Sequence, residues 1–253
     1  MLLQDTIIRL EKECGCFACC ALYDFNANEM LALYNEREVL KSASTIKTPI
    51  MLTVLEDVEA GKLAMSDLIP ITEKQFTGDS KHFTAESREA TLEFLLETMI
   101  TDSDNTATNA LIDLMGMDRI NGVIRSLGLY DTVLRRHMLD FNAAQRGSEN
   151  TTSARDMLRL YTLIHRRELV SDAICEMALP ILLRQHDDTL IRFSMPQQKT
   201  AHKTGGLPGI VHDTGILYGE NRTIGFAVLT WADDDVKGER FIQKLSAAVK
   251  EIL

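Results

Sequence analysis

Three short groups of residues carry the side chains that acid–base and acyl-transfer chemistry use. Ser44 and Lys47 lie three positions apart in KSASTIKTPIM. Ser103 and Asn105 frame the tripeptide SDN, and Lys203 opens the tetrapeptide KTGG. A lysine whose amine is neutral can take the proton of a nearby serine hydroxyl and turn that hydroxyl into a nucleophile. Together, these residues predict covalent catalysis by serine, provided that the fold brings them together.

The Ser44–Lys47 pair by itself allows two interpretations. On a helix, residues i and i+3 share a face, so Ser44 Oγ and Lys47 Nζ would lie within hydrogen-bond distance. Burial near a second cation would lower the pKa of Lys47 and let its neutral amine act as a base. Alternatively, Ser44 is an ordinary N-cap and Lys47 a solvated residue of the first turn. The other two motifs favour the catalytic interpretation.

Helices are predicted around the first two motifs. Apolar residues recur every fourth position from Ile46 to Val58, and Gly61 ends that run. The segments TLEFLLETMI, NTATNALIDLMG, DRINGVIRSLG and SARDMLRLYTLIHRRE are also helical in pattern. We expect helix N-caps at Asn105, Asp118 and Ser153.

Strands are predicted at both ends of the chain, each beside a helix. Residues 2–13 are amphipathic, and residues 16–35 have the pattern of a hairpin. From residue 198 the segments QKTAHKTGG, HDTGILYG and TIGFAVLTW read as strands, and a helix follows over 237–252. We expect both ends to share one sheet. The predicted domains are therefore a discontinuous α/β domain, 1–41 and 194–253, and an all-helical domain, 42–193, with the active site between them.

Composition limits the classes of partner. The chain of 253 residues has a formal charge of −10 with scattered cations, which argues against nucleic acid. No apolar run approaches the roughly 20 residues that span a bilayer, and the N-terminal MLLQDTIIRLEKE interleaves charges, unlike a secretory signal. The chain as given is expected to be cytoplasmic; an exported form whose signal peptide was removed is the alternative. Cysteines crowd into CGCFACC, which favours a buried strand over a zinc site.

The three motifs, S-x-x-K, S-D-N and K-T-G, occur in the order seen in class A β-lactamases and penicillin-binding proteins, which this chain resembles. TMITDSDNTATNALID, ENTTSARDMLRL and AHKTGGLPGIVHDTGILYG extend the resemblance to about residues 15–252. It implies the α/β, two-lobed serine β-lactamase-like fold, in which an antiparallel sheet flanked by terminal helices lies beside an all-helical domain.

The resemblance also implies a role for each matching residue. Ser44 would be the acylated nucleophile and Lys47 the base. Ser103 would pass a proton to the leaving nitrogen, and Lys203 would hold that hydroxyl and keep the pocket positive. Substrate binding would fall to Asn105, Thr204 and Gly206: Asn105 for a side-chain amide, Thr204 for a carboxylate, and the Gly206 N–H, with that of Ser44, for an oxyanion. No metal or organic cofactor is implied.

Two departures from the family pattern stand out. The loop 134–150, LRRHMLDFNAAQRGSEN, lacks the glutamate that activates the deacylating water, and the candidates to replace it are Asp140, His137 and Glu149, in that order. After KTGG, His212 and Asp213 stand where the family often supplies an arginine, so the fit to a substrate carboxylate is expected to be weaker.

The sequence thus predicts a serine hydrolase that opens a β-lactam amide through an acyl-Ser44 intermediate. Two alternatives stay open: an esterase or peptidase with the same machinery, and a β-lactam-binding protein that is acylated but releases the adduct poorly. All three act on a small molecule, a β-lactam or a related amide or ester.

Overall fold

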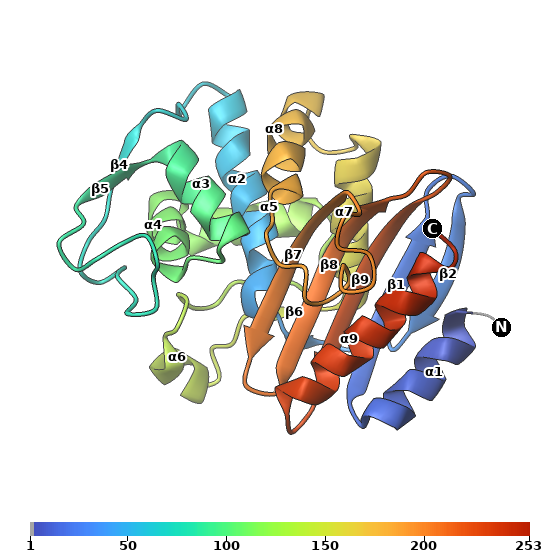
Figure 1. Ribbon diagram of the computed structural model, residues 1–253. Coiled ribbons are helices and arrows are strands. Elements are labelled where there is room, and N and C mark those ends of the chain that lie inside the picture. Colours follow the sequence, from blue (N-terminus) through green and yellow to red (C-terminus); the bar gives the residue numbers. More distant parts are fainter. Residues whose placement is uncertain (1–2) are drawn as a thin grey trace.

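A five-stranded antiparallel sheet built from both ends of the chain forms one half of the molecule (Figure 1). The computed structural model describes residues 3–253. The strand order is β2-β1-β9-β8-β7, so the N-terminal hairpin pairs with the last strand of the chain. These strands are β1 (Phe17–Asp24), β2 (Glu29–Tyr34), β7 (Thr200–Leu207), β8 (Ile210–Tyr218) and β9 (Thr223–Trp231). The predicted sheet shared by the two ends is confirmed.

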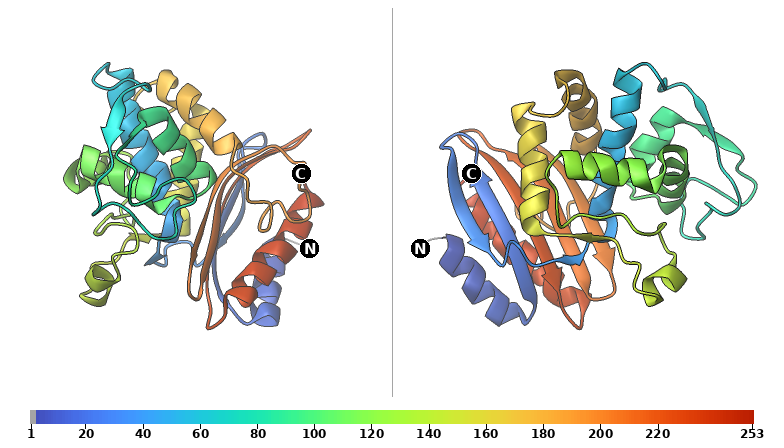
Figure 2. Two further views of the ribbon diagram at one scale, coloured as in Figure 1. Left: turned by 60° about the vertical axis from the view of Figure 1, so that its left-hand side comes forward. Right: turned by 180° about the vertical axis from the view of Figure 1, so that it is seen from behind.

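Helices cover both faces of this sheet. The terminal helices α1 (Leu3–Cys14) and α9 (Asp235–Lys250) pack together on one face, and the helical region lies on the other (Figures 1 and 2). Strands covered on both sides are apolar throughout rather than alternating, which is why FACCALY reads as one apolar run. Cys19 and Cys20 are fully buried on opposite faces of β1, in two different hydrophobic clusters. The buried-strand interpretation of this stretch is confirmed.

The helical region surrounds one central helix, α2. It contains the 3₁₀ helix η1 (Ala43–Ile46) and the helices α2 (Lys47–Glu59), α3 (Leu92–Thr101), α4 (Asn105–Met115), α5 (Met117–Ser126), α6 (Phe141–Gln145), α7 (Ala154–Arg166) and α8 (Asp172–Leu183). Two short antiparallel pairs accompany them: β3 (Leu40–Lys41) with β6 (Thr151–Thr152), and β4 (Leu68–Pro70) with β5 (Glu89–Thr91).

One hydrophobic cluster runs from the inner face of the sheet into the helices. Residues of α2 such as Ile50, Val54 and Leu55 are fully buried within it, as is Tyr161 of α7. A helix that is buried on all sides is held rigidly by close packing. The N-terminus of α2, which carries the Ser44–Lys47 motif, is therefore fixed against the sheet.

Two of the three predicted helix caps are displaced. Helix α4 is capped by Asp104, whose side chain accepts a hydrogen bond from Ala107 N, rather than by Asn105. Helix α5 follows Gly116, which places Asp118 in its first turn. Ser153 caps α7 as predicted. The first displacement matters, because it frees the Asn105 amide for other contacts.

Candidate active site

Ser44 lies in η1, directly before α2, where the edge strand β7 passes close to its backbone. A Cβ added to Gly205 would lie 3.1 Å from Ser44 N and 3.2 Å from Ala43 Cβ, so a larger residue would push β7 away. Glycine in KTGG thus permits the close approach of the two segments. Ala43 adopts φ of 46°. The backbone around the candidate nucleophile is strained, as is common at functional sites.

Lys47 is fully buried, and its amine lies at the centre of a polar cluster. Nζ donates to the Ser103 carbonyl oxygen at 2.6 Å and to Asn105 Oδ1 at 2.8 Å, and it lies 3.1 Å from Ser103 Oγ. The expected hydrogen bond to Ser44 Oγ is not among the contacts of the described residues. The sequence placed both side chains on one helix face, but the carbonyl and amide oxygens of the SDN segment hold the amine instead.

Lys203 approaches the same serine hydroxyl from the sheet. Its Nζ lies 3.1 Å from Ser103 Oγ and donates to the Thr204 carbonyl at 2.9 Å. The Ser103 hydroxyl is thus shared by two lysine amines. Ser103 itself adopts φ of 57°, a left-handed conformation that turns its side chain between them. The structure therefore brings Lys47, Ser103 and Lys203 together, as the resemblance implied.

Burial shifts the pKa values of both amines. Desolvation is the main reason that the pKa of Lys47 lies well below its usual range, and the nearby charge of Lys203 lowers it further. Desolvation also lowers the pKa of Lys203, to about 8, although Asp187 and Asp213 act in the opposite direction. In both cases desolvation, the largest effect, favours a neutral amine. A lowered pKa suits the amine of Lys47 to accept a proton.

Two adjoining cavities open onto this cluster. The larger, of about 330 Å³, is lined by Ser44, Asp79, Lys81, Asp102, Ser103, Asp104, Asn105, Thr204, Gly205 and Gly206. The smaller, of about 50 Å³, shares Ser44, Asn105 and Gly206 with it and is completed by residues of the 134–150 loop. All three predicted substrate-binding residues thus line the larger cavity beside Ser44.

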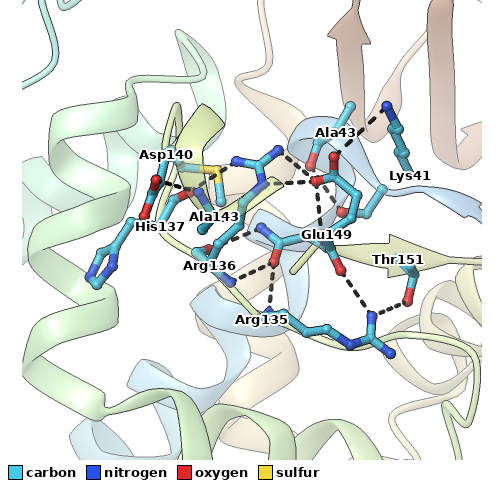
Figure 3. A network of polar contacts seen from close by, with 12 residues as sticks. Lys41, Ala43, Arg135, Arg136, His137, Asp140, Ala143, Glu149 and Thr151 are labelled. Atoms are coloured by element: carbon cyan, nitrogen blue, oxygen red, sulfur yellow. Dashed lines mark hydrogen bonds and ion pairs between the residues drawn. The ribbon is translucent and has the colours of Figure 1, made fainter. Parts of the chain in front are cut away.

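Of the three candidate bases in the loop, the two preferred ones face away from Ser44. Asp140 caps α6 by accepting from Ala143 N at 2.8 Å, and His137 pairs with Asp113 at 2.7 Å. Both line a separate cavity that Ser44 does not reach. Figure 3 shows them on the side of the loop opposite Ala43. The structure therefore does not favour Asp140 as the base, because its carboxylate caps a helix and lines a cavity without Ser44.

Glu149, the last choice, is the only carboxylate of the described residues that lines the smaller cavity with Ser44. It is not free: Arg136 NH2 lies 2.6 Å from Oε1, Asn150 N donates to the same oxygen at 3.0 Å, and Lys41 Nζ lies 3.9 Å from Oε2 (Figure 3). These contacts occupy both carboxylate oxygens of Glu149. Leu139, with φ of 60°, lines the same cavity with an apolar side chain.

Asp213 does not face the cavities either. It is fully buried, where its Oδ1 lies 2.9 Å from His202 Nδ1 and its Oδ2 accepts from Ile191 N at 3.1 Å. His212 is also buried, with Nε2 2.9 Å from the Lys41 carbonyl. The expected conflict between Asp213 and a substrate carboxylate is therefore wrong, because the side chain points into the protein.

Asp79 is a site residue that the sequence did not reveal. Its Oδ2 accepts a hydrogen bond from Asn105 Nδ2 at 2.7 Å, and it lines the larger cavity. Asp79 lies in an irregular segment, FTGDSKHFT, with no periodic pattern. Only the folded chain brings this loop over the SDN motif.

The whole described chain matches one protein family. Residues 3–253 match the "Beta-lactamase enzyme family". A protein named "Beta-lactamase" from Citrobacter koseri is 28% identical over 98% of this chain and 86% of its own length. Another of the same name, from Rhodobacter capsulatus, is 28% identical over 60% of this chain, and the match spans 52% of that protein.

Solved structures agree with this match. The structure of a beta-lactamase from Sphaerobacter thermophilus is similar with a TM-score of 0.88, 29% identity and coverage of 98% of this chain and 95% of that one. PBP-A, as a point mutant described as an acyl-enzyme complex with penicillin G, gives a TM-score of 0.88, 27% identity and coverage of 99% and 95%. Within residues 3–253, no helix combines the length and the apolar composition needed to cross a bilayer. The chain belongs to the beta-lactamase enzyme family.

Proposed function

We propose that Ser44 opens the amide of a β-lactam and forms an acyl-enzyme whose hydrolysis is slow. The observation that carries this proposal is the buried Lys47 amine, whose pKa lies well below its usual range in the same cluster as Ser103 and Lys203. Burying a lysine amine is costly, so a buried lysine with three polar partners indicates a functional role. Membership of the family supports an acyl-transfer role for it.

In the proposed acylation step, the Lys47 amine accepts the Ser44 hydroxyl proton as Oγ attacks the lactam carbonyl. The amine must first exchange one of its present oxygen partners for Ser44 Oγ, a rearrangement that substrate binding commonly brings about. The N–H groups of Ser44 and Gly206, which both border the cavities, would bind the developing oxyanion. Losing one such donor typically costs about 10²- to 10³-fold in rate.

Breaking the amide requires a proton on the leaving nitrogen. Ser103 Oγ is the donor that we assign to this step, since it lies 3.1 Å from both lysine amines. The proton lost by Ser44 to Lys47 can pass through Ser103 to the nitrogen, which conserves protons over the step. Lys203, while charged, attracts a substrate carboxylate and orients the Ser103 hydroxyl.

Slow release of the acyl group follows from the 134–150 loop. Hydrolysis needs a base beside the ester carbonyl, yet Asp140 and His137 line another cavity and Glu149 is paired with Arg136. The acyl-enzyme of PBP-A with penicillin G shows that a related fold can hold such an adduct. We therefore expect formation of the adduct to outpace its loss.

The test uses a chromogenic cephalosporin with two readouts, absorbance and intact mass spectrometry. The wild-type protein should gain the mass of one opened lactam within minutes and show a burst of absorbance followed by slow turnover. Ser44→Ala should show neither, while its thermal unfolding curve stays like that of the wild type. An absent adduct in the wild type, or an adduct that persists in Ser44→Ala, would refute the proposal.

A further inference from the structure

A cavity of about 810 Å³ lies away from the active site and shares no residue with either catalytic cavity. It lies between α7, the β1–β2 hairpin and the turn 128–131. Figure 2, right, shows α7 in yellow beside this hairpin in blue, and α7 contacts β1. The catalytic proposal leaves this groove unused.

One face of α7 lines the groove with arginines. Arg155, Arg159, Thr162 and Arg166 occupy positions i, i+4, i+7 and i+11, and all four border the cavity. At 1.5 Å per residue, the outer two arginines are separated by about 16 Å along the helix axis. Arg37, which pairs with Glu36 at 3.4 Å, adds a fourth guanidinium at the rim.

Two of the three α7 guanidiniums are held in place by neutral acceptors. Arg166 NH2 donates to Asn28 Oδ1 at 2.7 Å and to Tyr23 Oη at 3.0 Å, and its Cζ lies 5.6 Å from the Tyr23 ring centroid. Arg159 Nε donates to the Leu127 carbonyl at 2.6 Å.

The same arginine packs so tightly on Gly128 that a Cβ at that glycine would lie 2.8 Å from Arg159 Nε. Within residues 3–253, no carboxylate lies within salt-bridge distance of Arg155, Arg159 or Arg166. Some other arginines do pair with acids, as Arg119 does with Asp57 at 2.8 Å and Arg167 with Glu176 at 2.9 Å. The positive charge of the α7 stripe is thus positioned but not neutralised.

Three carboxylates border the groove and offset part of this charge, although none of them pairs with an α7 arginine of the described chain. Asp156 is nearly buried, and its Oδ2 accepts hydrogen bonds from Asp131 N, Thr132 N and Thr132 Oγ1. Asp131 Oδ2 accepts from Ser153 Oγ at 2.9 Å. Both are occupied by the backbone and hydroxyls of the 131–153 region. Glu168, at the end of α7, is the remaining acid of the lining.

We infer that this groove binds an elongated small molecule that carries two or more oxyanion groups, phosphate or carboxylate. Guanidinium groups form paired hydrogen bonds with both kinds of oxyanion. The Tyr23 ring, Leu158 and Leu163 provide an apolar wall for the body of such a ligand, and Tyr130, 80% exposed, stands at the rim. Four arginines against three carboxylates leave the lining slightly cationic in a protein of formal charge −10, which favours an anionic ligand over a cationic one.

Isothermal titration calorimetry with two probes tests this inference: inorganic tripolyphosphate for phosphate ligands, and citrate for carboxylate ligands. The wild type should bind at least one of them at a single site, more weakly as NaCl is raised. The probe that binds more tightly identifies the oxyanion. Arg155→Gln should weaken binding about tenfold, equivalent to about 1.4 kcal/mol, and Arg155→Gln with Arg166→Gln about a hundredfold.

Arg155 is an exposed residue of α7, and no hydrogen bond or ion pair of its side chain occurs in the described chain, so the single variant should fold normally. The matched control is Arg240→Gln on α9, which lies on the other face of the sheet and should leave affinity unchanged. Failure of both probes to bind the wild type, wild-type affinity in Arg155→Gln, or equal weakening in Arg240→Gln would each overturn the inference. None of these readouts depends on acylation of Ser44.

Discussion

The two sides of Ser44 are built differently. On the side of α2, SDN and β7, the two buried lysine amines converge on the Ser103 hydroxyl, each at 3.1 Å, and Asn105 donates to the Asp79 carboxylate. On the side of the 134–150 loop, each carboxylate is already used to cap a helix or to pair with an arginine. The difference indicates that the buried polar groups are arranged for forming an acyl-enzyme. No free base is placed to hydrolyse that acyl-enzyme among the described residues.

Replacing the amine of Lys47 should have the largest effect, a loss of acylation at Ser44. Lys47→Met keeps the apolar length of the side chain but removes the base, so acylation should slow by about 10²- to 10⁴-fold. Stopped-flow absorbance with the chromogenic cephalosporin measures the acylation rate. The control is Lys62→Met, beyond the other end of α2, where Lys62 pairs with Asp57 on the surface. Equal rates in wild type and Lys47→Met would show that another group activates Ser44.

A carboxylate added on the side of the 134–150 loop should bring the rate of acyl release closer to the rate of acylation. Leu139→Glu places an acid in the cavity that borders Ser44, and we expect hydrolysis of the acyl-enzyme to accelerate by about 10²-fold while acylation changes little. Time-resolved mass spectrometry of the adduct after removal of free lactam gives the release rate. Leu139→Gln is the matched control, because it has similar size and polarity but no basic group. Equal acceleration in both variants would exclude general-base catalysis by the new side chain.

The pH dependence should report on Lys203. Its pKa is lowered to about 8, so its positive charge disappears as the pH rises through that value. Acylation of a lactam that bears a carboxylate should therefore fall by up to about tenfold per unit above pH 8. A Lys203→Met variant should be slow and lack this limb. A profile that stays flat from pH 7 to 10 would contradict the role given to this charge.

The same shift has a consequence for stability. Between about 8 and the ordinary value of 10.5, the unfolded state binds more protons at Lys203 than the folded state does, so the free energy of unfolding rises with pH. The burial penalty on the charged form is fully present below about pH 8. Chemical denaturation of wild type and Lys203→Met over this range isolates the contribution.

The smallest effect is expected at Asp140. Because it caps α6, Asp140→Ala should lower the free energy of unfolding by about 1 kcal/mol, whereas Asp140→Asn keeps the cap and should be nearly neutral. Neither should change the rate of acyl release, since the side chain lines a different cavity. Release that slows in Asp140→Asn at unchanged stability would return Asp140 to the role of base.

The sequence was informative where chemistry needs a fixed residue type. The strand KTGG could be placed from its strand pattern and its match to the family motif, and the buried hairpin from a run of apolar residues. The structure added the reason for its glycine, which lets β7 pass Ser44. The roles of the residues in loop 134–150 could not be predicted in this way. Its candidate bases differ through their partners, and for His137 that partner, Asp113, is distant along the chain.

The sequence by itself indicated the sheet shared by the two ends, because periodicity is a local property of the chain, and its three motifs indicated the family and most of the residues around Ser44. Only the tertiary structure decided which atoms these residues touch. Lys47 bonds to the SDN segment rather than to Ser44, and Asp213 turns into the protein. Burial and the arrival of distant loops set those contacts and the amine pKa values, since both depend on neighbours that spacing along the chain does not reveal.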